Sequence, residues 1–232
     1  MADWRFGIWD VRMGRILFFY YFFQKIFNSV EPILYLCVIT LNVYTLNILK
    51  NFLTNNTMAN ATWAIDASHS EIQFKVKHLV ITTVTGNFKE FSGSVEAGDD
   101  FDGASIAFEA NVASINTNSE QRDGHLKSAD FFDAEQFPTL SFKSTSFTKD
   151  GDDFELVGDL TIKDVTLPVT LEVEYNGTAT DPWGNVKAGF ELKGKINRKD
   201  FGLSWNAITE AGSALVSEEV KLIANIQLVK QA

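Results

Sequence analysis

From Thr62 onward, apolar and polar residues alternate in short segments that are separated by Gly, Asp, Asn and Ser. In the first clear segment, Ile72, Phe74, Val76 and His78 fall on one face, and Gln and Lys residues fall on the other. A period of two is typical of antiparallel strands that bury one face and expose the other to water. This alternation constrains the chain more than any other feature, and it predicts an all-β fold.

About eight alternating segments follow one another in residues 58–232. Residues 119–133 break the alternation and predict one short helical insertion, after which strand resumes at Thr139. Turns are expected where residues form Asx turns or adopt positive φ, at residues 98–100, 150–152, 176–177 and 182–184. A closed antiparallel barrel is the economical architecture because closure removes exposed strand edges, and a two-sheet sandwich is the alternative.

Residues 1–57 differ chemically from residues 58–232. They hold five cationic and three anionic residues, a net charge of +2, whereas the remainder holds 15 and 27, a net charge of −12. Thirteen of the 30 aromatic residues also lie in the first part, including a run at residues 18–23. The chain therefore divides into an apolar, aromatic-rich N-terminal extension and a globular domain that begins at residue 58.

Three interpretations of this extension are open. Residues 16–49 would serve as a membrane anchor, although the uncharged stretch 33–49 is at the short limit for a span. A signal peptide would combine the early arginines with the apolar run 16–23, but no small-residue cleavage site follows closely. In the third interpretation the natural protein begins at Met58, and the extension comes from a wrongly chosen start codon.

Localisation depends on which interpretation holds. A membrane anchor would put the barrel in the periplasm, because cationic residues before the span favour a cytoplasmic N-terminus. A start at Met58 would leave the protein in the cytoplasm. In either case we expect residues 1–57 to make few contacts with the barrel, and a chain starting at Met58 to fold cooperatively.

Charge and cysteine content argue against several functions. The chain has a formal net charge of −10, whereas nucleic-acid binding needs clustered cations that release counterions. Cys37 is the single cysteine, so neither an internal disulfide nor a four-cysteine zinc site can form. No nucleic-acid partner and no cofactor are expected, and a monomer and a homodimer are both compatible with the sequence.

Short motifs in the globular domain resemble the YceI family, and they follow one another in the family's order. They include Trp63-Ala64-Ile65-Asp66, Phe74-Lys75-Val76-Lys77-His78, Arg122-Asp123-Gly124-His125-Leu126, Asp130-Phe131-Phe132-Asp133 and Gly158-Asp159-Leu160-Thr161-Ile162. The resemblance covers about residues 62–230. It implies a lipocalin-like antiparallel β-barrel that binds a polyisoprenoid or an isoprenoid quinone in its interior, and it does not imply an enzyme.

Phenylalanine is the most informative residue type for this interior, because 13 of its 20 copies lie after residue 58. The simpler interpretation is that these rings fill a solid core, whereas rings that line a partly empty barrel would bind lipid. Burial of one five-carbon isoprenoid unit would contribute about 3 to 4 kcal/mol, so a few units would suffice for tight binding. The candidate ligand-binding residues are Phe74, Val76, His78, Phe88, Phe108, Arg122, Phe131, Phe132, Phe142, Leu160 and Phe190.

The two polar candidates each have competing interpretations. His78 continues the buried face of its strand and would offer a hydrogen bond to a ligand head group, or it is a satisfied core histidine. Arg122 would meet a quinone oxygen or a prenyl phosphate at the barrel mouth, or it clamps neighbouring carbonyl groups.

Two further functions compete with lipid binding. An enzyme would use its histidines to hold a metal, or Asp123 and His125 for acid–base chemistry, although no His-x-His or His-Glu-x-x-His spacing occurs. A stress-response binding protein with a filled barrel would leave a cavity too small for two isoprenoid units.

Overall fold

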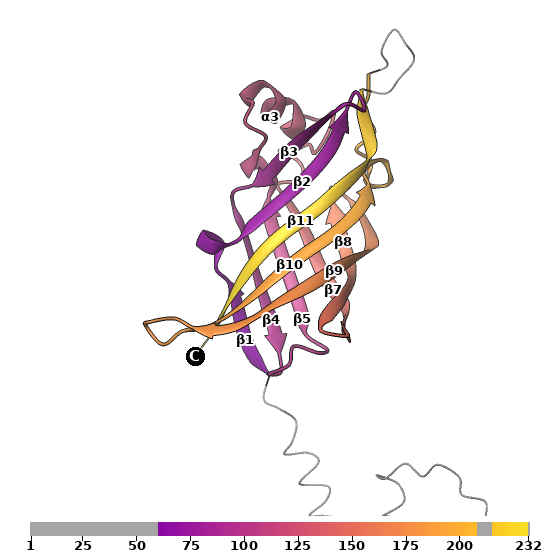
Figure 1. Cartoon of the computed structure of the whole chain (residues 1–232). Coiled ribbons are helices and arrows are strands. Elements are labelled where there is room, and N and C mark those ends of the chain that lie inside the picture. Colours follow the sequence, from indigo (N-terminus) through magenta and orange to yellow (C-terminus); the bar gives the residue numbers. More distant parts are fainter. Residues whose placement is uncertain (1–59, 208–214, 232) are drawn as a thin grey trace, which may run out of the picture. The chain divides into compact units, whose positions relative to one another are not determined.

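The alternating segments form antiparallel strands that close into a barrel (Figure 1). The computed structural model describes residues 60–207 and 215–231, so the predictions for residues 1–57 lie outside the described part. The strands are β1 (Ala61–Ile65), β2 (Glu71–His78), β3 (Thr82–Phe88), β4 (Phe91–Ala97), β5 (Ser105–Asn111), β6 (Ile115–Asn116), β7 (Thr139–Asp150), β8 (Asp153–Ile162), β9 (Val165–Thr180), β10 (Val186–Asn197) and β11 (Val216–Lys230). The helical elements are η2 (Ala67–His69), η3 (Val112–Ser114), α3 (Glu120–Lys127) and η4 (Arg198–Phe201).

Eight of the strands make the ring β1-β4-β5-β7-β8-β9-β10-β11, which the pairing of β1 with β11 closes. This ring confirms the predicted antiparallel barrel of about eight strands. The long strand β11 pairs with β1 near its end and with β2 in its first part, where Leu222 lies opposite Phe74. Strands β2, β3 and β6 thereby extend the sheet at the end of the barrel drawn at the top of Figure 1, which we call the upper end.

A carboxylate fastens the corner between β1 and β2. Asp66 accepts hydrogen bonds from Ser68 Oγ at 2.6 Å, from Gln227 Nε2 at 2.9 Å and from Lys187 Nζ at 3.3 Å. The bond from Ser68 is the largest cause that holds the pKa of Asp66 well below its ordinary value, and burial opposes it in part. The ionised side chain therefore joins η2, β10 and β11 at the seam of the barrel.

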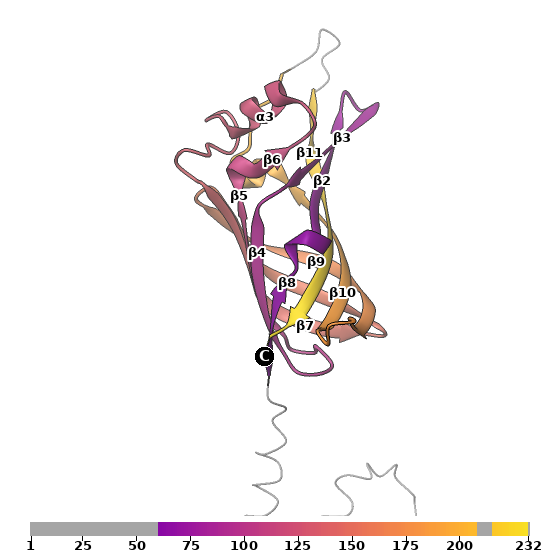
Figure 2. The same ribbon diagram turned by 90° about the vertical axis from the view of Figure 1, so that its left-hand side faces the viewer.

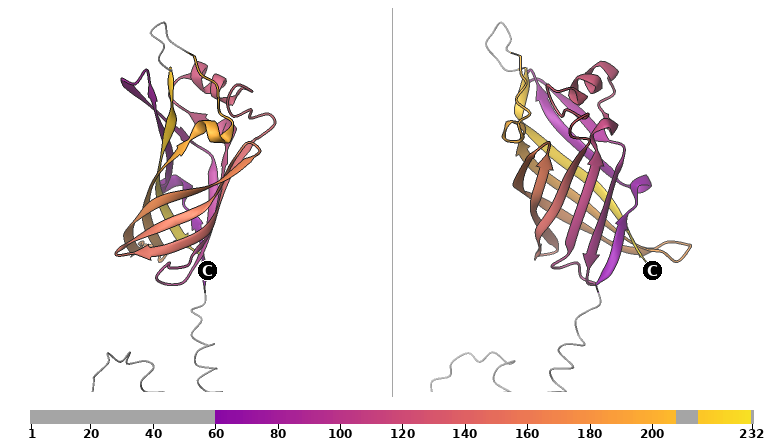
Figure 3. Two further views of the ribbon diagram at one scale, coloured as in Figure 1. Left: turned by 90° about the vertical axis from the view of Figure 1, so that its right-hand side faces the viewer. Right: turned by 180° about the vertical axis from the view of Figure 1, so that it is seen from behind.

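The predicted helical insertion is confirmed as α3, and strand resumes at Thr139 as expected. Asp123 attaches the helix to the barrel, since its carboxylate accepts hydrogen bonds from the Thr117 backbone N–H at 2.8 Å and from the Thr117 hydroxyl. Figures 2 and 3 place α3 at the upper end. In the part of the chain that the structure describes, no helix has the length and hydropathy to cross a membrane.

One of the four predicted turns is wrong. Asn176 and Gly177 lie inside β9, where Gly177 pairs with Gly189 and Tyr175 pairs with Phe190, so that Asn176 is an extra residue. The pair is a β-bulge, and Gly177 takes a φ of +96° that glycine adopts without strain. Asn-Gly bends a continuous strand here because β10 continues to pair with β9 on both sides of it.

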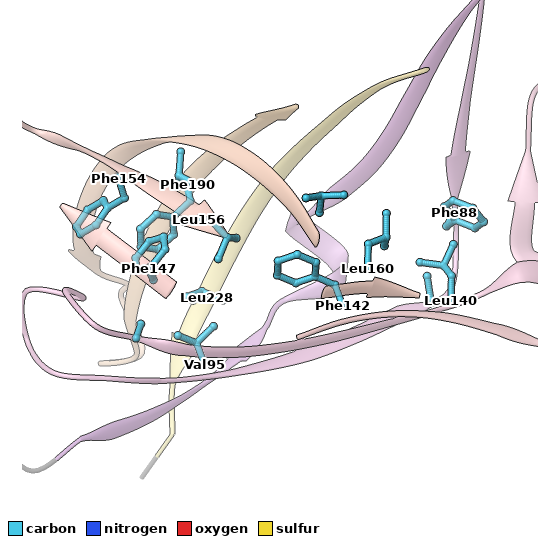
Figure 4. Close-up of a cluster of buried hydrophobic side chains, with 14 of the residues drawn as sticks. Phe88, Val95, Leu140, Phe142, Phe147, Phe154, Leu156, Leu160, Phe190 and Leu228 are labelled. Carbon is cyan, nitrogen blue, oxygen red and sulfur yellow. The ribbon is translucent and has the colours of Figure 1, made fainter. Parts of the chain in front are cut away.

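The buried side chains come from the inward phase of the alternation, as the pattern predicts. On β8, Phe154, Leu156 and Leu160 are buried, whereas Glu155 and Asp159 are exposed. Figure 4 shows the three apolar side chains among rings and branched chains from the strands around them. Each strand therefore contributes one face to a common interior.

Replacement of Phe74 by aspartate should destabilise the barrel, because this side chain faces the interior and a carboxylate there loses its hydration. We expect the free energy of unfolding to fall by about 3 kcal/mol. Lys75→Asp, on the outer face of the same strand, should change it by less than about 0.5 kcal/mol. Urea unfolding followed by circular dichroism measures both, and equal stability of the two variants would mean that β2 is shifted by one residue.

Candidate functional site

The interior of the barrel holds a cavity of about 260 Å³. All eight strands of the ring contribute to its wall, together with β2, β3 and the segment that contains α3. Among the described residues that line it, all are apolar except Gln73 and Arg198. Water inside such a wall would find few hydrogen-bond partners, so the cavity favours an apolar occupant.

Nine of the eleven candidate residues lie on this wall. They are Phe74, Val76, Phe88, Phe108, Phe131, Phe132, Phe142, Leu160 and Phe190. The rings of Phe88 and Phe132 meet edge to face with centroids 6.2 Å apart, which brings β3 into contact with the segment that follows α3. The structure thus brings together residues from distant parts of the sequence, and their binding of a lipid stays a prediction.

His78 and Arg122 do not line the cavity. His78 is the last residue of β2, and its carbonyl oxygen accepts a hydrogen bond from Thr82 Oγ1 at 3.1 Å. Arg122 donates from Nε to Thr117 Oγ1 at 2.7 Å and from Nη2 to the Thr117 carbonyl oxygen at 2.6 Å. The guanidinium group therefore clamps a neighbouring carbonyl, which is the structural one of its two interpretations.

Arg198 is the charged residue among the described residues of the cavity wall, and it is not one of the eleven candidates from the sequence. The residue is only 3% exposed, and burial lowers the pKa of its guanidinium from the ordinary value, which Glu218 opposes in part. It donates hydrogen bonds to four backbone carbonyl oxygens, those of Leu203, Trp205, Ser217 and Val216. Four carbonyl dipoles thus stabilise a positive charge beside an apolar cavity.

The alternation on β10 contained a signal for Arg198. Leu192 and Ile196 line the cavity, and Arg198 follows in the same phase where β10 passes into η4. A cation in phase with buried residues predicts a charge that backbone or acidic partners must satisfy. The partners that satisfy it lie up to 19 positions along the chain, on a segment whose approach the sequence does not specify.

Aromatic rings close the lower end of the cavity, which we define as the end opposite α3. Phe101, in the turn between β4 and β5, is 1% exposed, and its ring centroid lies 5.0 Å from that of Trp63 and 5.1 Å from that of Phe190. Phe147 stacks on Phe154 with centroids 4.6 Å apart, in the same part of the barrel as Phe190 (Figure 4). A ligand could not enter at this end without displacing packed rings.

The residues of the enzyme alternative do not meet in the cavity. Asp123 is engaged with Thr117, and His125 Nε2 lies 3.0 Å from the carboxylate of Asp130. In the described part of the chain, no three His, Cys, Asp or Glu side chains gather in the manner of a metal site. The geometry therefore points to the apolar cavity as the candidate site.

A comparison of sequences identifies the family of this domain. The profile of the YceI-like domain matches residues 63–228. The chain belongs to the YceI family. Protein YceI from Escherichia coli O17:K52:H18 is 41% identical over 167 residues, which cover 72% of this chain and 84% of the relative.

Two solved structures are similar to this chain. The YceI protein of Campylobacter jejuni is 32% identical and superposes with a TM-score of 0.58, over 68% of this chain and 91% of that chain. A polyisoprenoid binding domain from Saccharophagus degradans, implicated in plant cell wall breakdown, superposes with a TM-score of 0.50 at 15% identity, over 74% and 99% of the two chains. At the lower identity the likeness supports the fold alone.

Proposed function

We propose that this YceI-family barrel binds one apolar lipid of the isoprenoid class, either a polyprenyl chain or an isoprenoid quinone, and carries or stores it. The observation that carries the proposal is the cavity inside the barrel, whose described lining residues are apolar except Gln73 and Arg198. The structural neighbour from Saccharophagus degradans is described as a polyisoprenoid binding domain, and this chain shares its fold.

The size of the cavity favours this function over a filled barrel. A cavity of about 150 Å³ accommodates benzene, which has six carbons. On the same scale, the 260 Å³ inside this barrel accommodates about ten carbons, or two isoprenoid units. Burial of two units would contribute about 6 to 8 kcal/mol before the ordering of the chain is subtracted.

The composition of the wall favours binding over catalysis. Arg198 is the charged side chain among the described lining residues, and its hydrogen bonds are directed to backbone carbonyl oxygens. Gln73 also borders the cavity, but it lies in the outward phase of β2, where its side chain hydrogen-bonds Glu71. A ligand held here would make apolar contacts along most of its length, and these contacts bind a chain without activating any bond in it.

Organic extraction of the purified protein, followed by mass spectrometry, tests the proposal. We expect one isoprenoid species in an amount close to one molecule per barrel, and the mass distinguishes a quinone from a polyprenyl chain. Recovery of straight-chain fatty acids alone would contradict the isoprenoid class. Recovery of no lipid from several expression hosts would contradict lipid binding altogether.

A further inference from the structure

The turn between β2 and β3 projects three apolar side chains into water. Leu79 is 37% exposed, Val80 is 75% exposed and Ile81 is 79% exposed. They follow one another at the tip of a hairpin in which His78 pairs with Thr82. Contiguous apolar side chains of this size on a surface indicate a site that contacts another apolar phase.

The backbone of this turn is as unusual as its side chains. Leu79 has a φ of +51° and Val80 a φ of +65°, values in the left-handed region that glycine and asparagine adopt easily. A β-branched residue such as valine is disfavoured there. The turn therefore combines backbone strain with apolar exposure, and an Asn-Gly pair would avoid both in a hairpin that served only to reverse the chain.

Lysines flank the turn on the outer surface. Lys75 and Lys77 lie on the outward phase of β2, and Lys221 of β11 lies opposite Lys75. Within the described residues, none of the three forms a salt bridge. Glu218 and Glu219 lie in the bulge of β11 beside Lys77, but they form salt bridges with Lys199 and Lys195. The three unpaired lysines therefore place positive charge beside the turn on a domain whose net charge is −12. This local charge is complementary to an anionic layer of lipid head groups.

The β2–β3 hairpin also lies at the upper end of the barrel. Figures 2 and 3 show its tip at the same end as α3, away from the lower end, where the turn between β4 and β5 lies. Its strand β2 continues directly into the cavity wall through Val76 and Phe74. A surface that met this tip would therefore face the upper end of the cavity.

We propose that the β2–β3 turn docks the barrel onto an anionic lipid surface. Leu79, Val80 and Ile81 enter the boundary between head groups and acyl chains, and Lys75 and Lys77 lie against the anionic head groups. Docking transfers the three exposed apolar side chains from water into the lipid, and this transfer stabilises the docked state. None of these five residues lines the cavity, so the docking does not depend on whether the cavity holds a lipid.

A dye placed at the tip tests the docking locally, whatever residues 1–57 contribute to membrane binding. The full chain carries Cys37→Ser and Val80→Cys, labelled with an environment-sensitive nitrobenzoxadiazole dye. The matched control carries the label at Trp183→Cys, on the exposed turn between β9 and β10 at the lower end. Both proteins are mixed with vesicles of phosphatidylglycerol or of phosphatidylcholine that contain a quencher on the acyl chains, after cooperative melting has verified the fold.

We expect a blue shift and lipid quenching at the tip with phosphatidylglycerol, weaker signals with phosphatidylcholine, and no change at the control position. Lys75→Glu combined with Lys77→Glu should abolish the preference for phosphatidylglycerol. Absence of quenching at the tip with both vesicles would overturn the proposal. A blue shift that needs no vesicles and grows with protein concentration would also overturn it, because the turn would then dock onto a second copy of the chain.

Discussion

Replacement of Arg198 by alanine is expected to lower the free energy of unfolding by about 4 kcal/mol and the melting temperature by about 10 °C. The guanidinium group is buried and donates to the carbonyl oxygens of Trp205, Ser217 and Val216 at 2.8 to 3.3 Å, and to that of Leu203. Its removal takes a donor from each of these partly or fully buried acceptors, of which Val216 keeps a hydrogen bond from Asn206 Nδ2 at 3.0 Å. Urea denaturation and thermal melting, both followed by near-ultraviolet circular dichroism, measure the two quantities.

Two neighbouring changes serve as controls for Arg198. Lys199→Ala removes an exposed partner of Glu218 and should cost less than about 1 kcal/mol. Arg198→Lys keeps the charge but loses the planar fork of donors, so its stability should fall between the wild type and the alanine variant. If Arg198→Ala is as stable as the wild type, the hydrogen bonds of Arg198 do not hold η4 against the start of β11, and the prediction is wrong.

Replacement of Ala224 by phenylalanine is expected to reduce the lipid recovered from the protein at least about tenfold. Ala224 lies on the cavity wall between Leu192 of β10 and Ile72 of β2, so a ring added there occupies the interior. A six-membered ring needs about 150 Å³ of cavity volume. The part of the cavity that remains beside the new ring would therefore hold less than one isoprenoid unit. The lost contacts correspond to at least about 1.4 kcal/mol, which is a factor of ten in affinity. Mass spectrometry of organic extracts gives the ratio of lipid to protein.

The next residue along β11 provides the matched control. Asn225 is exposed on the outer face, so Asn225→Phe adds the same ring outside the barrel and should leave the recovered lipid unchanged. Cooperative melting of both variants shows whether each barrel is intact. Equal lipid content in the two folded variants would mean that the lipid lies outside this cavity.

Much of the fold follows from local patterns in the sequence. The phase of Phe74 and Val76 on β2 and of Leu160 on β8 correctly predicts which side chains face inward, because successive side chains of a strand point to opposite faces. The loss of alternation in residues 119–133 correctly predicts α3. The same reasoning fails at Asn176, because a turn and a bulge use the same residues and differ only in whether the neighbouring strand continues.

The candidate site depends on contacts between residues that are far apart in the sequence. Alternation predicts an apolar interior, but it does not predict whether the rings fill that interior or leave 260 Å³ among them. That volume depends on how eight strands tilt and stagger when the ring closes. The hydrogen bonds of Arg198 likewise depend on residues 203–205 and on the start of β11 arriving on one side of η4.

The sequence by itself determined the strand faces, the helical insertion and the YceI resemblance, since each rests on residues that are close together along the chain. Only the tertiary structure decided that the interior is partly empty, that Arg198 lies on its wall, and that Arg122 holds Thr117 instead. The physical reason is that a side chain's face is set by its own strand, whereas the space and the partners that it meets are set by strands that pair with it from far along the chain.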